Sequence, residues 1–275
     1  MRPACPSSKR FDTAADPPTI DAGKSGVHSR EHLADQADRQ PETTHALTFE
    51  AHGRPGPTTS GMMAGMDVEE LIARHPRVFH TMSATAWPSV QRHGLLSTQR
   101  LIDLFGLDAA ARDRLLNAPR KESTTLRAPG LPPAVIRDQK PMKFIAEKID
   151  PGSSLTEYLT AINSRVFFWA SAERLDRLRQ AKAYRSEDQV ILHVDTRMLV
   201  ERHGAGIELC RLNSGAVTQK NHPPRGHRSW LPIADYPYDD YRRRYGSDGA
   251  LVEVTVLDAV PDVLNLTTRI EGPAG

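Results

Sequence analysis

The chain has 275 residues, 39% of them hydrophobic, and its 36 Lys and Arg are almost balanced by 34 Asp and Glu, for a formal net charge of +2. This balance excludes a protein-wide field that would attract a polyanion or a membrane surface, so any nucleic-acid contact has to be local. No stretch approaches the roughly 20 apolar residues of a membrane-spanning helix, and the N-terminus lacks the apolar core of a secretory signal. We therefore expect a cytoplasmic protein.

Common metal, nucleotide and hydrolase motifs are missing from the sequence. Its two cysteines, Cys5 and Cys210, have no spacing that suggests a zinc site or a disulfide framework. No G-x-G-x-x-G or Walker loop, no G-x-S-x-G and no H-E-x-x-H occurs. We expect no bound metal, and we expect Cys210 to be a small buried hydrophobe.

Apolar residues are distributed unevenly along the chain. Residues 1–65 are rich in Pro, Ser, Thr, Asp and Gly, and they cannot bury enough apolar surface to offset the entropy of ordering. We predict a disordered leader there, one α+β domain over residues 66–270 and a tail over residues 271–275. Met66 is one of three candidate natural starts, and a chain that begins at Met66 is expected to keep its stability and activity.

The first half of the domain predicts short elements. Asp67 can cap a helix, while Pro88 at a first helical position and Gly94 at an end bracket another. In chain order we predict a helix over 67–75, a strand over 77–82, a helix over 87–93, one or two helices over 100–118, a strand over 134–137 in a polar, Pro-rich stretch, and a helix over 154–163.

The second half carries the strongest strands. We predict a buried strand over 165–170, a helix over 172–184, a strand over 189–199 that turns helical after Asp195, a strand and turn over 208–215, a long loop over 216–247, a strand over 250–257 and a closing segment over 259–268. A loop of that length is typical of a functional segment. Long helices rarely alternate with the strands, which favours a mixed, mainly antiparallel α+β sheet.

Glu253 is the sharpest candidate for chemistry, because its carboxylate interrupts the apolar run ALVEVTVL. In a strand buried on one face, Glu253 and Thr255 could both face solvent. The alternative is a carboxylate at the floor of a cleft. There it could bind a ribose hydroxyl and stabilise an oxocarbenium-like centre while a glycosidic bond opens.

Other candidates have both an ordinary and a functional interpretation. His80 beside Thr81 is either a core or surface histidine or a partner for a ribose or an amide. Phe168 and Trp169 are either core residues or, for the one that faces a cleft, a ring that stacks on a ligand. Arg225, in the long loop beside Gly226, belongs either to a solvated basic turn or to a phosphate contact.

These pieces in their order resemble the ADP-ribosyltransferase fold, and in particular the DNA-targeting ADP-ribosyltransferase toxins of the DarT type. FHTMSATAWPSVQRHGLLST resembles the His-bearing strand, helix and Gly-Leu-Leu-Ser turn that cradle NAD; RVFFWASAERL resembles the middle strand; and VEVTVLDAVPDV resembles the segment with the catalytic Glu. The resemblance covers residues 77–263 and extends to a widespread group of bacterial proteins of unknown activity. It implies a split, mainly antiparallel sheet with peripheral helices.

The resemblance also implies an enzyme that transfers ADP-ribose from NAD, its substrate, to a nucleic acid or a protein, with an antitoxin-like partner. Glu253 is then the catalytic residue that orients the ribose, and His80 acts with it. Either Arg165 or Arg225 would meet the pyrophosphate. The implied NAD-binding residues are His80, Thr81, Gly94, Leu95, Arg165, Phe168, Trp169 and Arg225.

Two alternatives share the same scaffold. The chain could be a non-catalytic module that binds a nucleotide or ADP-ribose, with Glu253 inactive. It could also resemble the RNA 2′-phosphotransferases, which open with a similar His-bearing strand but need several arginines around one phosphate. The acceptor itself, including a single strand at a groove near Arg242–Arg244, is beyond what the sequence specifies.

Overall fold

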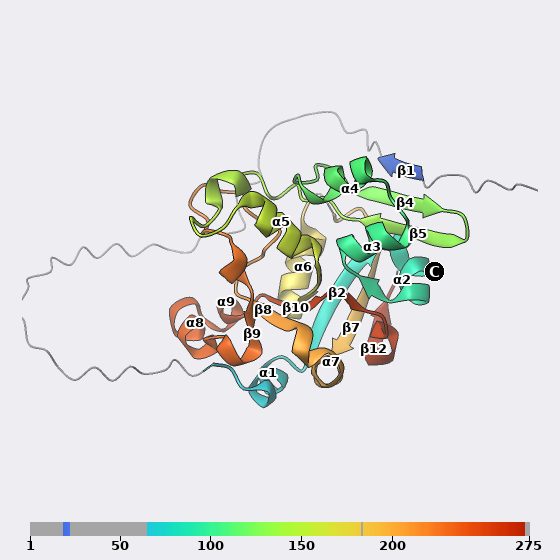
Figure 1. The fold of residues 1–275 in the computed structure, drawn as a ribbon. Coiled ribbons are helices and arrows are strands. Elements are labelled where there is room, and N and C mark those ends of the chain that lie inside the picture. The colour runs from blue at the N-terminus through green and yellow to red at the C-terminus, as the bar shows by residue number, and fades with distance from the viewer. Residues whose placement is uncertain (1–18, 23–64, 183, 273–275) are drawn as a thin grey trace, which may run out of the picture. The chain divides into compact units, whose positions relative to one another are not determined.

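The computed structural model describes residues 19–22, 65–182 and 184–272 of the chain. Its centre is an antiparallel seven-stranded sheet (Figure 1). The strand order is β12 (Thr267–Glu271), β7 (Gln189–Asp195), β2 (Arg77–Ser83), β6 (Arg165–Trp169), β10 (Glu253–Leu257), β8 (Ile207–Cys210) and β9 (Leu231–Pro232). The predicted α+β fold with a mainly antiparallel sheet is confirmed.

The sheet is weakly joined between β2 and β6. β2 pairs with β7 along its whole length, from Arg77 to Ser83, whereas it pairs with β6 in register only at Phe79 and Trp169. β6 in turn pairs with β10 along its full length. The two halves of the sheet therefore separate immediately after Phe79, at the position of His80.

Two smaller sheets flank the seven-stranded sheet. One consists of β1 (Thr19–Ala22), β4 (Thr124–Ala128) and β5 (Leu131–Ile136), and the other of β3 (Leu95–Leu96) and β11 (Ala259–Val260). The sequence predicted only the end of β5 and missed β4. Pro132 and Pro133 made this stretch read as a loop, but the structure accommodates them in β5, which among the described strands pairs with β4 alone.

The described helices are short and most have a polar N-cap. They are α1 (Val68–Arg74), α2 (Trp87–His93), α3 (Thr98–Leu104), α4 (Ala109–Leu116), α5 (Leu155–Asn163), α6 (Ala172–Gln180), α7 (Thr196–His203), α8 (Tyr238–Tyr245), α9 (Ser247–Ala250) and α10 (Val263–Leu266). Side chains of Asp67, Ser97, Asp108, Ser154, Ser171 and Asp195 accept from backbone N–H groups in the first turns of six of them. The prediction of a loop over residues 216–247 is wrong at α8. The buried side of this helix consists of tyrosines, so the sequence shows no helical spacing of aliphatic residues there.

The largest apolar cluster contains Val78, Phe168, Leu192, Leu209 and Val254, one from each of five neighbouring strands. These strands are therefore fixed by burial along the middle of the sheet. Figure 1 shows the β4–β5 hairpin near α2 and α3, on the side of the sheet away from α8 and α9. Residues of β5 line the same cavity as residues of β2 and β6, so the hairpin lies against the place where these two strands separate.

Strand β1 lies within the segment predicted to be a disordered leader, so the prediction missed a strand at these four residues. The rest of the predicted leader up to residue 64, residues 1–18 and 23–64, lies outside the described residues. Its backbone pairs with β4, from Thr19 opposite Arg127 to Ala22 opposite Thr124. A chain shortened to begin at Met66 is expected to stay folded, because β1 lies at the edge of the small sheet. Its β4 amides should exchange with solvent faster than in the full chain, while those of β2 keep their protection. Unchanged exchange in β4 would show that β1 does not protect this edge.

Gly94 ends α2 with a φ of 70° and lies against the backbone of Pro261. A Cβ there would lie 2.4 Å from the Cα and the carbonyl oxygen of Pro261. We expect Gly94→Ala to lower the free energy of unfolding by on the order of 3 kcal/mol, because strain and a backbone clash add. Gly106→Ala is the matched control, with a φ of 61° and no described atom within 4 Å of its Cβ. Urea unfolding should show the larger loss for Gly94→Ala, and equal losses would contradict the clash.

Candidate functional site

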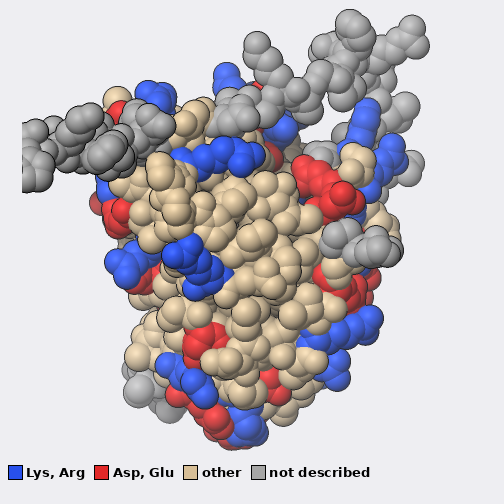
Figure 2. Space-filling view, turned by 90° about the vertical axis from the view of Figure 1, so that its right-hand side faces the viewer, with Lys and Arg blue, Asp and Glu red and all other residues tan. Residues whose placement is uncertain are grey.

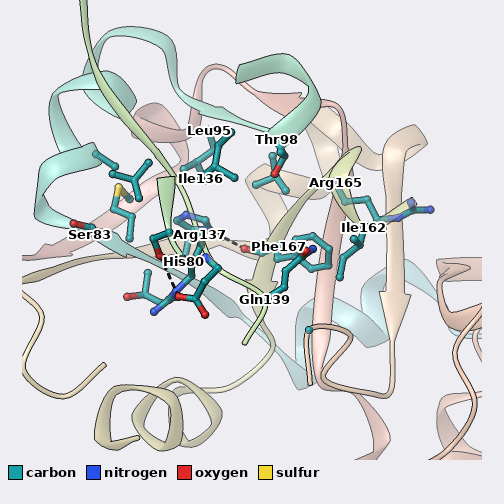
Figure 3. Close-up of a pocket in the computed structure, with 18 of the residues that line it drawn as sticks. His80, Ser83, Leu95, Thr98, Ile136, Arg137, Gln139, Ile162, Arg165 and Phe167 are labelled. Carbon is teal, nitrogen blue, oxygen red and sulfur yellow. Dashed lines mark hydrogen bonds between the residues drawn. The ribbon is translucent and has the colours of Figure 1, made fainter. Parts of the chain in front are cut away.

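A cavity of about 340 Å³ opens where β2 and β6 separate, within the size range of small-molecule sites (Figure 3). Its walls come from β2, the turn after α2, β5, β6, the end of α5 and the loop after β8. Of the residues predicted for the site, it brings together His80, Thr81, Gly94, Leu95, Arg165, Phe168, Trp169 and Glu253. Arg225 is the predicted residue that does not line it.

His80 bridges the gap in the sheet. Its Nδ1 lies 2.8 Å from the carbonyl oxygen of Phe167, so it donates there and replaces the backbone bond lost when the strands separate (Figure 3). With Nδ1 protonated, Nε2 of the neutral ring is an acceptor. Burial, helped by the charge of nearby Arg137 and opposed by the hydrogen bond to Phe167, lowers the pKa of His80 from 6.5 to about 4, so the imidazole is neutral at physiological pH.

Glu253 is the first residue of β10 and is only 5% exposed. Its Oε1 accepts from the backbone N–H of Ser214 at 3.1 Å, while its buried Oε2 has no partner among the described residues. Burial raises the pKa of this carboxyl from 4.5 to about 7, and hydrogen bonding to Ser214 offsets part of that rise. The interpretation of Glu253 as a solvent-facing strand residue is therefore wrong. It is a carboxyl with one free oxygen in a cavity wall.

The loop after β8 holds Glu253 in place. The hydroxyl of Tyr158, buried on α5, donates to the carbonyl oxygen of Ser214 at 2.9 Å, and the Tyr158 ring stacks on Trp230. Both backbone groups of Ser214 are thus used, its N–H by Glu253 and its carbonyl by Tyr158. This arrangement fixes the donor that faces the carboxylate.

The aromatic residues of β6 alternate between the core and the cavity. Phe168 is 1% exposed and belongs to the main core. Its ring and that of His80 are arranged edge to face, with their centroids 5.8 Å apart. Phe167 and Trp169 lie on the opposite face of the strand, are half-buried, and line the cavity. Phe168 therefore supports His80, and the ring that a ligand can stack on is Phe167 or Trp169. Phe167 was not among the residues predicted for the site, although strict alternation would have paired it with Trp169.

Arg165 lines the cavity but is committed to neighbouring groups. Its guanidinium forms an ion pair with Glu208, donates to the carbonyl oxygen of Ala161 at 2.6 Å, and lies over the Trp230 ring. In Figure 3 it points away from His80. The geometry does not support the predicted pyrophosphate contact for Arg165, because its guanidinium is already committed to this half-buried ion pair and to the Ala161 carbonyl.

Arg225 is buried, 2% exposed, and ties the long loop together. Its guanidinium donates to the carbonyl oxygens of Pro223 at 2.7 Å, Ala216 at 3.0 Å and Asn213 at 3.3 Å. The predicted phosphate contact is therefore replaced by a structural role. Through the Asn213 and Ala216 carbonyls, Arg225 shapes the loop that presents the Ser214 N–H to Glu253.

We expect Arg225→Gln to lower the free energy of unfolding by about 3 kcal/mol, because it leaves buried carbonyl groups without donors. Arg228→Gln, three residues along and exposed, removes the same charge from the same loop and should change stability little. Thermal unfolding of both variants tests the contrast. Equal melting temperatures for the two variants would refute the structural role of Arg225.

Thr81 and the turn after α2 complete the predicted wall. Thr81 Oγ1 donates to Gln189 Oε1 at 2.9 Å, which leaves the hydroxyl oxygen as an acceptor. Gly94 and Leu95 line the cavity beside Pro261 and β11, which hold the turn through the β3–β11 pairing. Gly94, Leu95 and Leu96 of the Gly-Leu-Leu-Ser segment thus line the cavity, while Ser97 caps α3.

Two further arginines, Arg120 and Arg137, line the cavity and were not selected from the sequence. Both lie in the polar stretch that precedes α5, where no periodic pattern sets them apart. Only the tertiary structure shows that they belong to the site, because the pairing of β4 with β5 brings Arg137 beside His80 (Figure 3).

Charges on the surface are interspersed. Figure 2 shows one face with a broad uncharged centre and with Lys, Arg, Asp and Glu around its margins. No cluster of three or more potential metal ligands occurs among the described residues, and none of the described helices is long and apolar enough to cross a membrane.

Comparison with known proteins places the chain among relatives of unknown activity. No curated protein and no solved structure matches it. A family of unknown function, DUF7002, matches residues 76–267, from the start of β2 to the start of β12. The matched segment contains every described residue of the cavity wall. The chain therefore belongs to the DUF7002 family.

Proposed function

We propose that the protein is an ADP-ribosyltransferase that uses NAD as its substrate. The observation that carries the proposal is the meeting of His80 and Glu253 in one cavity at the separation of β2 and β6. Both groups have the protonation behaviour that the reaction needs. His80 is a neutral acceptor held by Phe167, and Glu253 ionises near neutral pH with one oxygen unpaired.

In the proposed reaction, Nε2 of His80 and the Thr81 hydroxyl accept from ribose hydroxyls, and Phe167 or Trp169 packs on a ring of NAD. The glycosidic C–N bond breaks, and its electron pair leaves with nicotinamide. The ionised Glu253 stabilises the positive charge that develops on the ribose. The acceptor then forms a bond to the ribose carbon, and its proton passes to Glu253, whose pKa near 7 suits a general base.

The acceptor is proposed at the level of class, as a nucleic acid or a protein, in the cytoplasm and with an antitoxin-like partner. The mixed charges in Figure 2 fit a local contact better than a duplex-wide footprint. Arg242–Arg244 on exposed parts of α8 are the proposed local contact for a single strand.

The test is incubation of the protein with labelled NAD, with and without DNA, RNA or protein, and measurement of nicotinamide release and label transfer. Wild type should release nicotinamide, with water as the default acceptor. Glu253→Gln should lose on the order of a hundredfold or more in turnover, and Glu122→Gln, which changes an exposed carboxyl, should keep it.

Equal turnover by wild type and Glu253→Gln would refute the proposed chemistry. Stabilisation of both proteins by NAD, without any nicotinamide release, would instead identify a non-catalytic binding module. A protein that NAD neither stabilises nor reacts with would exclude both functions.

A further inference from the structure

Arg120 is held in the cavity wall by neutral groups. Its Nε donates to the carbonyl oxygen of Arg137 at 2.9 Å, and its Nη1 donates to the Leu115 carbonyl at 2.7 Å and to Asn163 Oδ1 at 2.8 Å. Asn163 is itself buried and fixed by a bond to the Leu116 carbonyl. Three of the five N–H groups of the guanidinium are therefore used, and the two on Nη2 have no acceptor among the described residues.

Arg120 forms no ion pair with a described carboxylate, and the charge of Asp138 only partly opposes the effect of burial on its pKa. Burial lowers its pKa from 12.5 to about 10, which leaves the guanidinium charged at physiological pH. A half-buried cation without a paired carboxylate is costly, and an anionic ligand in the cavity would offset that cost. The backbone holds the residue in place, because Gln139 bonds both the N–H and the carbonyl oxygen of Arg120.

Arg137 extends this charge toward His80. Its guanidinium lies 4.3 Å from the Tyr184 ring centroid and forms no ion pair with a described residue. Asp138, the next residue along the chain, is already engaged by the hydroxyls of Ser123 and Tyr184 and by the backbone N–H of Lys140. The cavity is also lined by the carboxyls of exposed Glu187 and of Glu253, so the positive charge of the two arginines is local to their part of the wall.

We propose that Arg120 and Arg137 form a binding site for the phosphate or diphosphate group of a nucleotide ligand, beside the His80–Glu253 centre. Nη2 of Arg120 and the guanidinium of Arg137 donate to phosphate oxygens, and Asn163 orients Arg120. As the site for the diphosphate of NAD, the assignment rests on the proposed function. As an anion site it stands on its own, and it takes the role that Arg165 and Arg225 cannot fill.

Calorimetric titration of the full chain with ADP-ribose, inorganic pyrophosphate and adenosine tests the assignment. Wild type should bind the two phosphate-bearing probes, with an affinity that falls as salt rises. Arg137→Gln and Arg120→Gln should each weaken that binding by about tenfold or more and leave adenosine unchanged. Arg114→Gln, which removes an exposed charge on α4, should bind all probes like wild type.

Wild-type affinity for both phosphate-bearing probes in Arg120→Gln and Arg137→Gln would overturn the assignment, as would a wild type that binds neither probe. Arg137→Gln guards against a folding defect, because its side chain donates no hydrogen bond to a described residue. Loss of phosphate binding with no NAD turnover by wild type would refute only the transferase. NAD turnover with an unchanged KM in both variants would refute only the anion site.

Discussion

Glu253→Gln is expected to stabilise the folded protein by about 3 kcal/mol at pH 8 and to leave its stability unchanged near pH 4. The pKa of Glu253 is about 7 in the folded state against 4.5 for a free side chain, mainly because the carboxyl is buried. Between these values the folded state keeps a proton that the unfolded state releases. Wild type therefore loses stability as pH rises from 4.5 to 7, and the variant, which cannot ionise, does not.

Glutamine also preserves the local contact, because its Oε1 can still accept from the Ser214 N–H. Urea unfolding of both proteins at pH 4, 6 and 8 measures the difference. Glu122→Gln, at an exposed position, should show no comparable pH-dependent gain. A constant difference between wild type and Glu253→Gln at all three pH values would contradict the burial of an ionisable carboxyl.

His80→Asn is expected to show the opposite pH dependence. The pKa of His80 is about 4 in the folded state against 6.5 for a free side chain, because burial opposes the charged ring. The unfolded state therefore binds a proton between pH 6.5 and 4 that the folded state rejects. Wild type loses about 3 kcal/mol of stability from this group as pH falls through that range, and His80→Asn escapes the loss.

At pH 7.5 the same variant should be less stable than wild type, because asparagine fills less of the space beside Phe168 and has to re-form the bond to the Phe167 carbonyl. Below pH 5 the difference should shrink or reverse. Unfolding curves measured across pH 4 to 8 decide this, and a variant that remains equally destabilised at every pH would show that His80 is not buried in its neutral form.

Together the two variants separate two opposing contributions to the pH dependence of folding stability, which overlap in wild type. The Glu253 contribution falls between pH 4.5 and 7, while the His80 contribution rises between pH 4 and 6.5. Glu253→Gln should therefore leave a profile that rises with pH, and His80→Asn one that falls. Natural sites often keep such strained groups at the expense of stability.

The sequence by itself determined the local elements of this protein. Apolar runs indicated the strands β2, β6, β7 and β10, while polar N-caps and Gly94 indicated helix ends. Both signals are local, because the spacing of apolar residues and the capping of the backbone involve only a few neighbouring residues. It also singled out His80 and Glu253, since a polar side chain inside a buried strand stands out from its neighbours. The ADP-ribosyltransferase activity that the resemblance implies stays a prediction.

Only the tertiary structure decided what each polar group contacts. The sequence does not distinguish the four arginines considered for phosphate binding. In the structure, Glu208 pairs with Arg165 and loop carbonyls accept from Arg225, whereas Arg120 and Arg137 face the cavity without an ion pair to a described residue. Ion pairing and burial depend on residues far apart in the chain, which no local pattern encodes. The raised pKa of Glu253 has the same origin, because desolvation comes from the whole wall of packed strands and loops around it.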